Sequence, residues 1–140
     1  MSQIYFFSEE TSFHLENSSI HKKWLNFVAS EENNGIDHLN YIFCSDDYLL
    51  KINKEHLNHN TFTDVITFEY ATMPIEGDIF ISVDRIKENA SEFNVSFMNE
   101  LNRVMVHGLL HLLGYKDKTK EDKIEMTSKE DHYLSMLDKY

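Results

Sequence analysis

The sequence has little of several residue types that mark particular classes of protein. It contains one cysteine, one proline and four glycines among 140 residues. A lone Cys44 excludes an internal disulfide framework and a four-cysteine zinc site, so we expect no disulfide partner and a reduced, cytoplasmic protein. No apolar run approaches the roughly 18 residues of a membrane span. The first residues, MSQIYFFSEE, lack the features of a secretory signal, so we also expect no membrane association.

Basic residues are scarce as well. Thirteen Lys and Arg stand against 24 Asp and Glu, which gives a net charge of −11. This charge opposes non-specific adhesion to phosphate backbones, so a nucleic-acid hypothesis needs a local basic cluster or a bound metal ion. Eight histidines point to the metal. The hydrophobic fraction of 41% is ample for one core, and the length predicts a single domain over residues 1–140.

Hydrophobic periodicity predicts an α+β fold with one small sheet. The expected strands cover residues 2–7, 38–45, 63–70 and 78–83, with turn signals at Met73-Pro74 and Gly77 between the last two. The expected helices run from Ser19 to about Asn34, Asp46 to about His56, Asp84 to Phe93, Phe97 to Leu113, and Thr119 to Leu137. Asp46, Asp84 and Ser96 are the candidate N-caps, and the last helix is expected to bury Ile124, Leu134 and Leu137.

Residues 107–117, HGLLHLLGYKD, concentrate the chemistry of the chain. On a helix, His107 and His111 leave the same face one turn apart, which is the spacing that offers two nitrogens to one zinc ion. Gly114 lets the chain turn in the left-handed region, so that Asp117 can return as a third ligand. Two histidines and one carboxylate leave a fourth position open, as in a catalytic zinc site.

Gly108 bears on the competing interpretations of this motif. The simplest alternative is a helix whose polar face carries two histidines without binding metal. A glycine inside a helix costs about 1 kcal/mol relative to alanine, so Gly108 indicates something packed close to the helix. It also occupies the place where zinc peptidases of this spacing carry the glutamate that serves as general base.

The motif resembles a known family. HGLLHLLGYKD is similar to the HGxLHLxGYDH signature of the YbeY-type endoribonucleases, which are bacterial rRNA maturation factors. Upstream, Asn53 followed by TDVITF at residues 63–68 resembles the family's N…TDVLSF block. Gly77-Asp78-Ile79 resembles its GDI strand, and Glu125-Met126 lie where its final helix begins.

The resemblance implies a metal-dependent, single-strand-specific endoribonuclease in rRNA maturation and ribosome quality control. The implied partners are single-stranded or ribosomal RNA and the ribosome or its small subunit. The implied fold is a mixed four-stranded sheet with about five helices and a zincin-like metal-site helix. The expected cofactor is one Zn²⁺ ion, held by His107, His111 and Asp117, which are also the expected catalytic residues through that metal.

Two positions depart from the family pattern. The family's third ligand is a histidine, where this chain has Asp117, and its preceding aspartate is Lys116 here. A carboxylate in place of an imidazole lowers the charge of the site by one and should make bound water less acidic. The family also places an arginine four residues after the asparagine that is Asn53 here, and this chain has Leu57. An arginine would suit phosphate binding, and Lys54 is a candidate substitute.

These departures keep other functions open. A non-catalytic, metal-stabilised ribosome assembly factor would not need the missing arginine. A zinc peptidase would need a carboxylate converging from another segment. Lesser candidates are His56 and His59 in a polar loop, Glu121 or Asp122 as a group that orients a ligand histidine, and the four lysines of residues 116–123 as a basic cluster for RNA.

Overall fold

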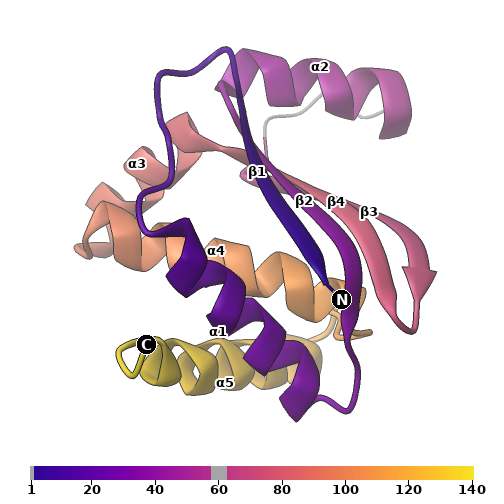
Figure 1. Cartoon of the computed structure of the whole chain (residues 1–140). Coiled ribbons are helices and arrows are strands. Elements are labelled where there is room, and N and C mark those ends of the chain that lie inside the picture. The colour runs from indigo at the N-terminus through magenta and orange to yellow at the C-terminus, as the bar shows by residue number, and fades with distance from the viewer. Residues whose placement is uncertain (1, 58–62) are drawn as a thin grey trace.

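The computed structural model describes residues 2–57 and 63–140 and is drawn in Figure 1. The strands are β1 (Gln3–Glu9), β2 (Ile36–Cys44), β3 (Val65–Thr72) and β4 (Ile75–Ser82). The helices are α1 (Ser18–Glu31), α2 (Asp46–Leu57), α3 (Val83–Phe93), α4 (Phe97–Leu112) and α5 (Lys120–Leu137). The α+β prediction is confirmed, with each predicted element in its predicted place in the chain. Within the described residues, no helix is long and apolar enough to cross a bilayer.

The four strands form one mixed sheet in the order β1-β2-β4-β3. β1 and β4 both pair parallel to β2, whereas β3 pairs antiparallel to β4 as the first arm of a hairpin. This is the mixed four-stranded sheet that the resemblance implied.

Helices cover both faces of this sheet unequally. Figure 1 shows α1, α4 and α5 on one side of the strands and α2 on the other. Because successive side chains of a strand point to opposite faces, Ile79 and Ile81 of β4 join the larger core beneath α4. Phe80, between them, packs instead against a smaller cluster that contains Leu49 of α2. The larger core therefore lies between the sheet and the helix that carries the histidine motif.

Glycines set how closely α4 approaches the sheet. A Cβ atom on Gly108 would lie 2.9 Å from Ile79 Cγ2, closer than real Cβ contacts. Gly108 therefore makes room for β4, as its position inside a helix predicted. A Cβ on Gly77 would lie 2.8 Å from the Phe68 carbonyl oxygen and 2.9 Å from Leu112 Cδ1. The sequence prediction of a turn at Gly77 is wrong, because this glycine lies within β4, where it admits the end of α4.

Two predicted N-caps are also wrong, because a serine one or two residues earlier takes each role. Ser45 Oγ accepts a hydrogen bond from the Tyr48 N–H at 3.1 Å, so Ser45 rather than Asp46 caps α2. Ser82 Oγ accepts from the Arg85 N–H at 3.2 Å, so Ser82 rather than Asp84 caps α3.

The buried face of α5 also differs from the prediction. Ile124 is 62% exposed, whereas Met126, Glu130 and Tyr133 are buried. Of the three residues predicted to be buried, only Leu134 and Leu137 pack against the core, and both are partly buried. Relative to the predicted orientation, α5 is rotated about its axis, so that the carboxylate of Glu130 points into the protein.

Candidate metal centre

The last two turns of α4 carry both histidines of the motif. α4 starts at the predicted cap Ser96, whose Oγ accepts from the Asn99 N–H at 3.0 Å. His107 and His111 project from one face with ring centroids 4.5 Å apart and ring planes at 85°. Their Nε2 atoms lie 2.9 Å apart, so the two imidazoles aim their outer nitrogens at a common point.

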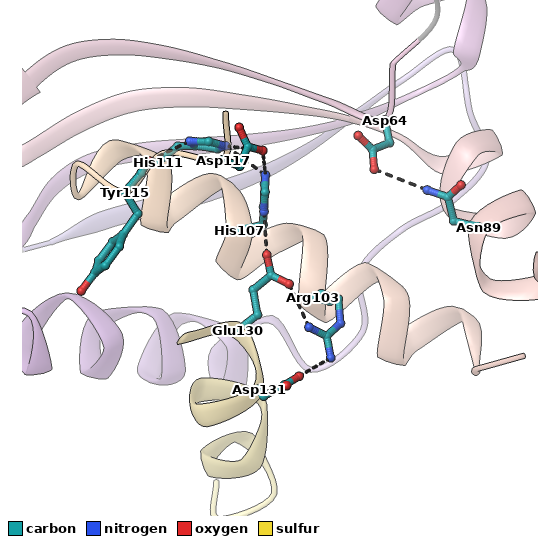
Figure 2. Close-up of polar contacts among 9 residues, drawn as sticks. All are labelled: Asp64, Asn89, Arg103, His107, His111, Tyr115, Asp117, Glu130 and Asp131. Atoms are coloured by element: carbon teal, nitrogen blue, oxygen red, sulfur yellow. Dashed lines mark hydrogen bonds and ion pairs between the residues drawn. The ribbon is translucent and has the colours of Figure 1, made fainter. Parts of the chain in front are cut away.

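The chain beyond α4 brings Asp117 to the same point. Gly114 has a φ of +103°, which side chains other than glycine rarely adopt, and its N–H donates to the His111 carbonyl at 3.0 Å. After this turn, Asp117 Oδ2 lies 3.4 Å from Nε2 of His107 and 3.4 Å from Nε2 of His111. Figure 2 shows the carboxylate beside both rings. The structure thus brings the three predicted residues together.

The inner nitrogens of both rings are held by acceptors. His107 Nδ1 lies 2.6 Å from Glu130 Oε2, and His111 Nδ1 lies 3.0 Å from the Tyr115 carbonyl oxygen. A carboxylate and a carbonyl only accept, so each Nδ1 can donate its proton to them and each ring can present a lone pair on Nε2 to a metal ion. A carboxylate and a backbone carbonyl are the partners that metal-ligating histidines ordinarily have.

The distances among the three outer atoms fit a metal ion. Ligand atoms about 2.1 Å from a tetrahedral zinc ion lie roughly 3.4 Å from one another, and the three separations here are 2.9, 3.4 and 3.4 Å. A cation between two lone pairs and a carboxylate oxygen this close would relieve their mutual repulsion. Within the part of the chain that the structure describes, His107, His111 and Asp117 form a group able to hold a metal ion.

Glu130 connects the centre to a partly buried ion pair. Its side chain is 8% exposed, and its Oε1 accepts from Arg103 Nη1 at 2.8 Å. Arg103 Nη2 donates in turn to Asp131 Oδ1 at 2.6 Å, and Figure 2 shows the resulting chain of contacts from Asp131 to His107. Neither Glu130 nor Arg103 was predicted from the sequence. The sequence could have indicated Glu130, because it has helical spacing with Met126 and Tyr133, the other buried residues of α5.

The carboxylates around His107 raise the pKa of its imidazole. Burial by itself would lower the pKa of His107, but the hydrogen bond to Glu130 and the charges of Glu130, Asp117 and Asp64 outweigh it and raise that pKa. Asp64 is a further carboxylate of this region, and its Oδ2 accepts from Asn89 Nδ2 at 3.4 Å (Figure 2). Burial raises the pKa of Asp64, although the charge of His107 opposes the shift. The region is therefore anionic and favours a cation.

The lesser candidates from the sequence form no hydrogen bond or ion pair with the histidine pair among the described residues. Asp122 forms a capping box with Thr119 at the start of α5, and Glu121 is exposed, so neither orients a ligand histidine. His56 is exposed with its ring edge against Phe68, and His59 lies outside the described residues.

Leu57, which stands in place of the family's arginine, ends α2 and is 40% exposed. The candidate substitute Lys54, one turn earlier on α2, is also exposed.

Comparisons with known proteins show the family of this chain. Residues 3–138 match the family model described as Endoribonuclease YbeY. The chain is 50% identical over 135 residues to the Endoribonuclease YbeY of Cytophaga hutchinsonii, covering 95% of this chain and 94% of that one. It is 50% identical over 132 residues to that of Flavobacterium johnsoniae, covering 94% and 95%. The solution structure of a Thermotoga maritima protein, 29% identical, matches with a TM-score of 0.69 over 96% of this chain and 89% of that one. The chain belongs to the YbeY family.

Proposed function

We propose that residues 1–140 form a single metal-dependent hydrolase domain whose activity is endonucleolytic cleavage of RNA in rRNA processing. The relatives that match this chain over nearly its full length are named endoribonucleases. One observation carries the proposal: Nε2 of His107, Nε2 of His111 and Oδ2 of Asp117 lie 2.9–3.4 Å apart at the end of α4. The finer parts of the proposal are the metal, the preference for single strands and the partner.

His107, His111 and Asp117 are the proposed ligands, with zinc as the proposed ion, because two imidazoles and a carboxylate suit it. When bound, the ion would supply the Lewis-acid chemistry of phosphodiester hydrolysis. Glu130 and the Tyr115 carbonyl keep the Nδ1 protons in place and so hold both Nε2 lone pairs toward the ion. The side chain of His107 is 19% exposed and that of His111 is 26% exposed, which leaves the centre open to a substrate.

A basic cluster beside the centre supports RNA as the substrate. Lys116 and Lys118 flank Asp117 and are exposed, and Lys120 and Lys123 follow on the first turn of α5. The last two line a groove of about 740 Å³ along α5. In a chain of net charge −11, this cluster and the metal supply the local positive charge that phosphate binding needs. We propose that a single strand follows these lysines to the metal.

Particular residues argue against or for the two other candidate functions, the zinc peptidase and the assembly factor. The glutamate that zinc peptidases carry directly after the first histidine is absent, because position 108 is Gly, and a Cβ there would lie 2.9 Å from Ile79 Cγ2. A metal-stabilised ribosome assembly factor without catalysis stays the second candidate, because position 57 holds Leu instead of a guanidinium. We further propose action in the cytoplasm on the ribosome or its small subunit, and the free buried thiol of Cys44 suits a reducing compartment.

The test is metal content together with RNA cleavage. Purified protein should carry about one zinc ion per chain and cut single-stranded RNA in preference to duplex RNA. Chelation, His107→Ala and His111→Ala should remove both metal and activity. His14→Ala, which removes an exposed imidazole on the segment between β1 and α1, is the matched control and should change neither.

The outcomes separate the candidates. Metal binding with ribosome association but without cleavage in the wild type would favour the assembly factor. Cleavage that survives both chelation and His111→Ala would come from a contaminating ribonuclease and would refute the enzymatic proposal.

A further inference from the structure

Glu32, at the end of α1, is the centre of a partly buried polar cluster that includes Tyr115 of the chain after α4. Its side chain is 13% exposed and accepts three hydrogen bonds, from the hydroxyls of Tyr115 and Tyr133 and from Lys129 Nζ. The Tyr115 contact measures 2.6 Å and the Lys129 contact 3.2 Å. Burial by itself would raise the pKa of Glu32, but the three donors outweigh it and lower that pKa. The carboxylate is therefore an ionised anchor that links α1, α5 and the chain after α4.

Tyr115 belongs to both this cluster and the metal centre. Its hydroxyl binds Glu32, while its backbone carbonyl oxygen accepts from His111 Nδ1 at 3.0 Å. Figure 2 shows the side chain pointing from the end of α4 away from the two histidines and toward α1. Tyr115 follows Gly114, whose φ of +103° marks a sharp turn outside regular helix. The Tyr115 N–H also donates to the Leu110 carbonyl at 3.0 Å. A side chain anchored at its far end adds a second restraint on the rotation of the Tyr115 peptide and so helps to fix where its carbonyl points.

We infer that Glu32 is a positioning residue of the metal centre, acting through Tyr115 to hold the carbonyl that orients His111. The inference rests on the proposed metal-dependent function. A residue 79 positions before His111 would then set the ring rotation of a ligand, and through the Nδ1 proton would keep the His111 Nε2 lone pair available. Lys129, whose Nζ lies 5.6 Å from the centre of the Tyr115 ring, adds a second contact to the same anchor.

The cluster contains its own control. Tyr133 donates to the same Glu32 carboxylate as Tyr115, but no contact links Tyr133 to His107, His111 or Asp117 among the described residues. Tyr115→Phe and Tyr133→Phe each delete one hydroxyl from one cluster and leave every backbone carbonyl in place. A purely structural role for the cluster would make the two variants alike.

The expected results differ for the two tyrosines. Loss of a partner that orients a ligand typically weakens metal binding 10- to 100-fold, and for this indirect contact we expect about tenfold in Glu32→Ala and in Tyr115→Phe. The double variant should bind zinc no more weakly than either single one, because both changes break the same link. Tyr133→Phe should lower the melting temperature of the metal-free protein and keep the wild-type affinity. Glu31→Ala, which removes the exposed neighbouring carboxylate, should change neither.

The experiment is a zinc competition titration against a chromophoric chelator at a temperature where every variant is folded. The visible spectrum of the Co²⁺-loaded proteins gives a second readout, since a rotated imidazole alters the ligand field. Equal loss of zinc affinity in Tyr115→Phe and Tyr133→Phe, or wild-type affinity in both Glu32→Ala and Tyr115→Phe, would overturn the inference. A wild-type protein that binds no zinc would instead overturn the proposed function itself, so the two failures are distinguishable.

Discussion

Replacing Glu130 by glutamine probes the metal centre without touching a ligand. The carboxylate accepts on both sides, from His107 Nδ1 at 2.6 Å and from Arg103 Nη1 at 2.8 Å. An amide has only one acceptor oxygen. If that oxygen faces Arg103, the amide N–H₂ group faces His107 Nδ1, moves the ring proton to Nε2 and removes the lone pair that would bind the metal. If the oxygen faces His107, two donors meet at Arg103 in a nearly closed space.

The magnitude follows from these two arrangements. The first arrangement costs the contact that orients His107, and such a loss typically weakens metal affinity 10- to 100-fold, or about 1.4–2.8 kcal/mol. The second arrangement keeps that contact and costs the one to Arg103 instead. The metal-free protein should lose less than a full ion pair would give, because Arg103 keeps its 2.6 Å contact with Asp131. A hydrogen bond to a charged group contributes about 1.5–3 kcal/mol, which bounds the decrease in the free energy of unfolding.

The assay is zinc affinity by chelator competition, with urea unfolding of the metal-free protein measured in parallel. Asp131→Asn is the matched control. It alters the other carboxylate that binds Arg103, but this one is 60% exposed, so we expect less than about 1 kcal/mol in stability and no change in zinc affinity. Wild-type zinc affinity in Glu130→Gln would refute the tautomer argument. Equal effects of both changes would show that Arg103, rather than the contact to His107, is what matters.

Three further predictions concern other parts of the chain. Gly108→Ala should lower the free energy of unfolding by about 0–2 kcal/mol, since the clash with Ile79 costs about 1–3 kcal/mol and the better helix propensity of alanine contributes about 1 kcal/mol. Gly35→Ala is the control and should not destabilise, because a Cβ there meets open space. A Gly108→Ala protein more stable than the wild type would contradict the close packing. Leu57→Arg should raise the rate of RNA cleavage by up to about 100-fold while Leu57→Gln should not, and equal rates would exclude a role for charge at this position. Asp64→Asn should stabilise the metal-free protein at neutral pH, because burial disfavours the charged carboxylate and so raises the pKa of Asp64. Thermal unfolding should show this gain in stability vanishing as the pH falls toward and below about 3.9, where the carboxyl becomes protonated in both the folded and the unfolded state. A gain that persists below that pH would have another cause.

The elements that position the site were predictable because their signals are local. Ser96 caps α4, Gly114 turns the chain at its end, and the 107, 111 spacing puts two rings on one face, all within about 20 residues of sequence. These features depend on the backbone of a single helix and its exit, where tertiary contacts add little. Asp117 could be predicted for the same reason, since only three residues separate it from the turn.

The groups that hold the ligands were not predictable in the same way. Glu130 and Glu32 lie 23 and 79 positions from the histidines that they influence, and their contacts exist only once α5 and α1 have packed. Even the orientation of α5 was mistaken, since Ile124 is exposed while Glu130 is buried. A buried carboxylate contradicts the hydrophobic pattern on which such predictions rest, because its burial is offset by specific donors. Gly77 was misread for a similar reason, since its need for space arises from Leu112, 35 positions later.

The charge distribution explains how so acidic a chain can favour both a cation and RNA. Asp117, Glu130 and Asp64 gather negative charge around His107, and this charge raises the pKa of the imidazole and attracts a metal ion to the same place. A bound divalent cation would make the local charge less negative just where a phosphodiester must approach. The exposed lysines from Lys116 to Lys123 then extend this less negative surface along α5, while the remaining acidic surface repels RNA. RNA affinity should therefore depend on metal loading, so that chelation weakens binding as well as cleavage. Undiminished RNA binding by the metal-free protein would place the RNA surface elsewhere.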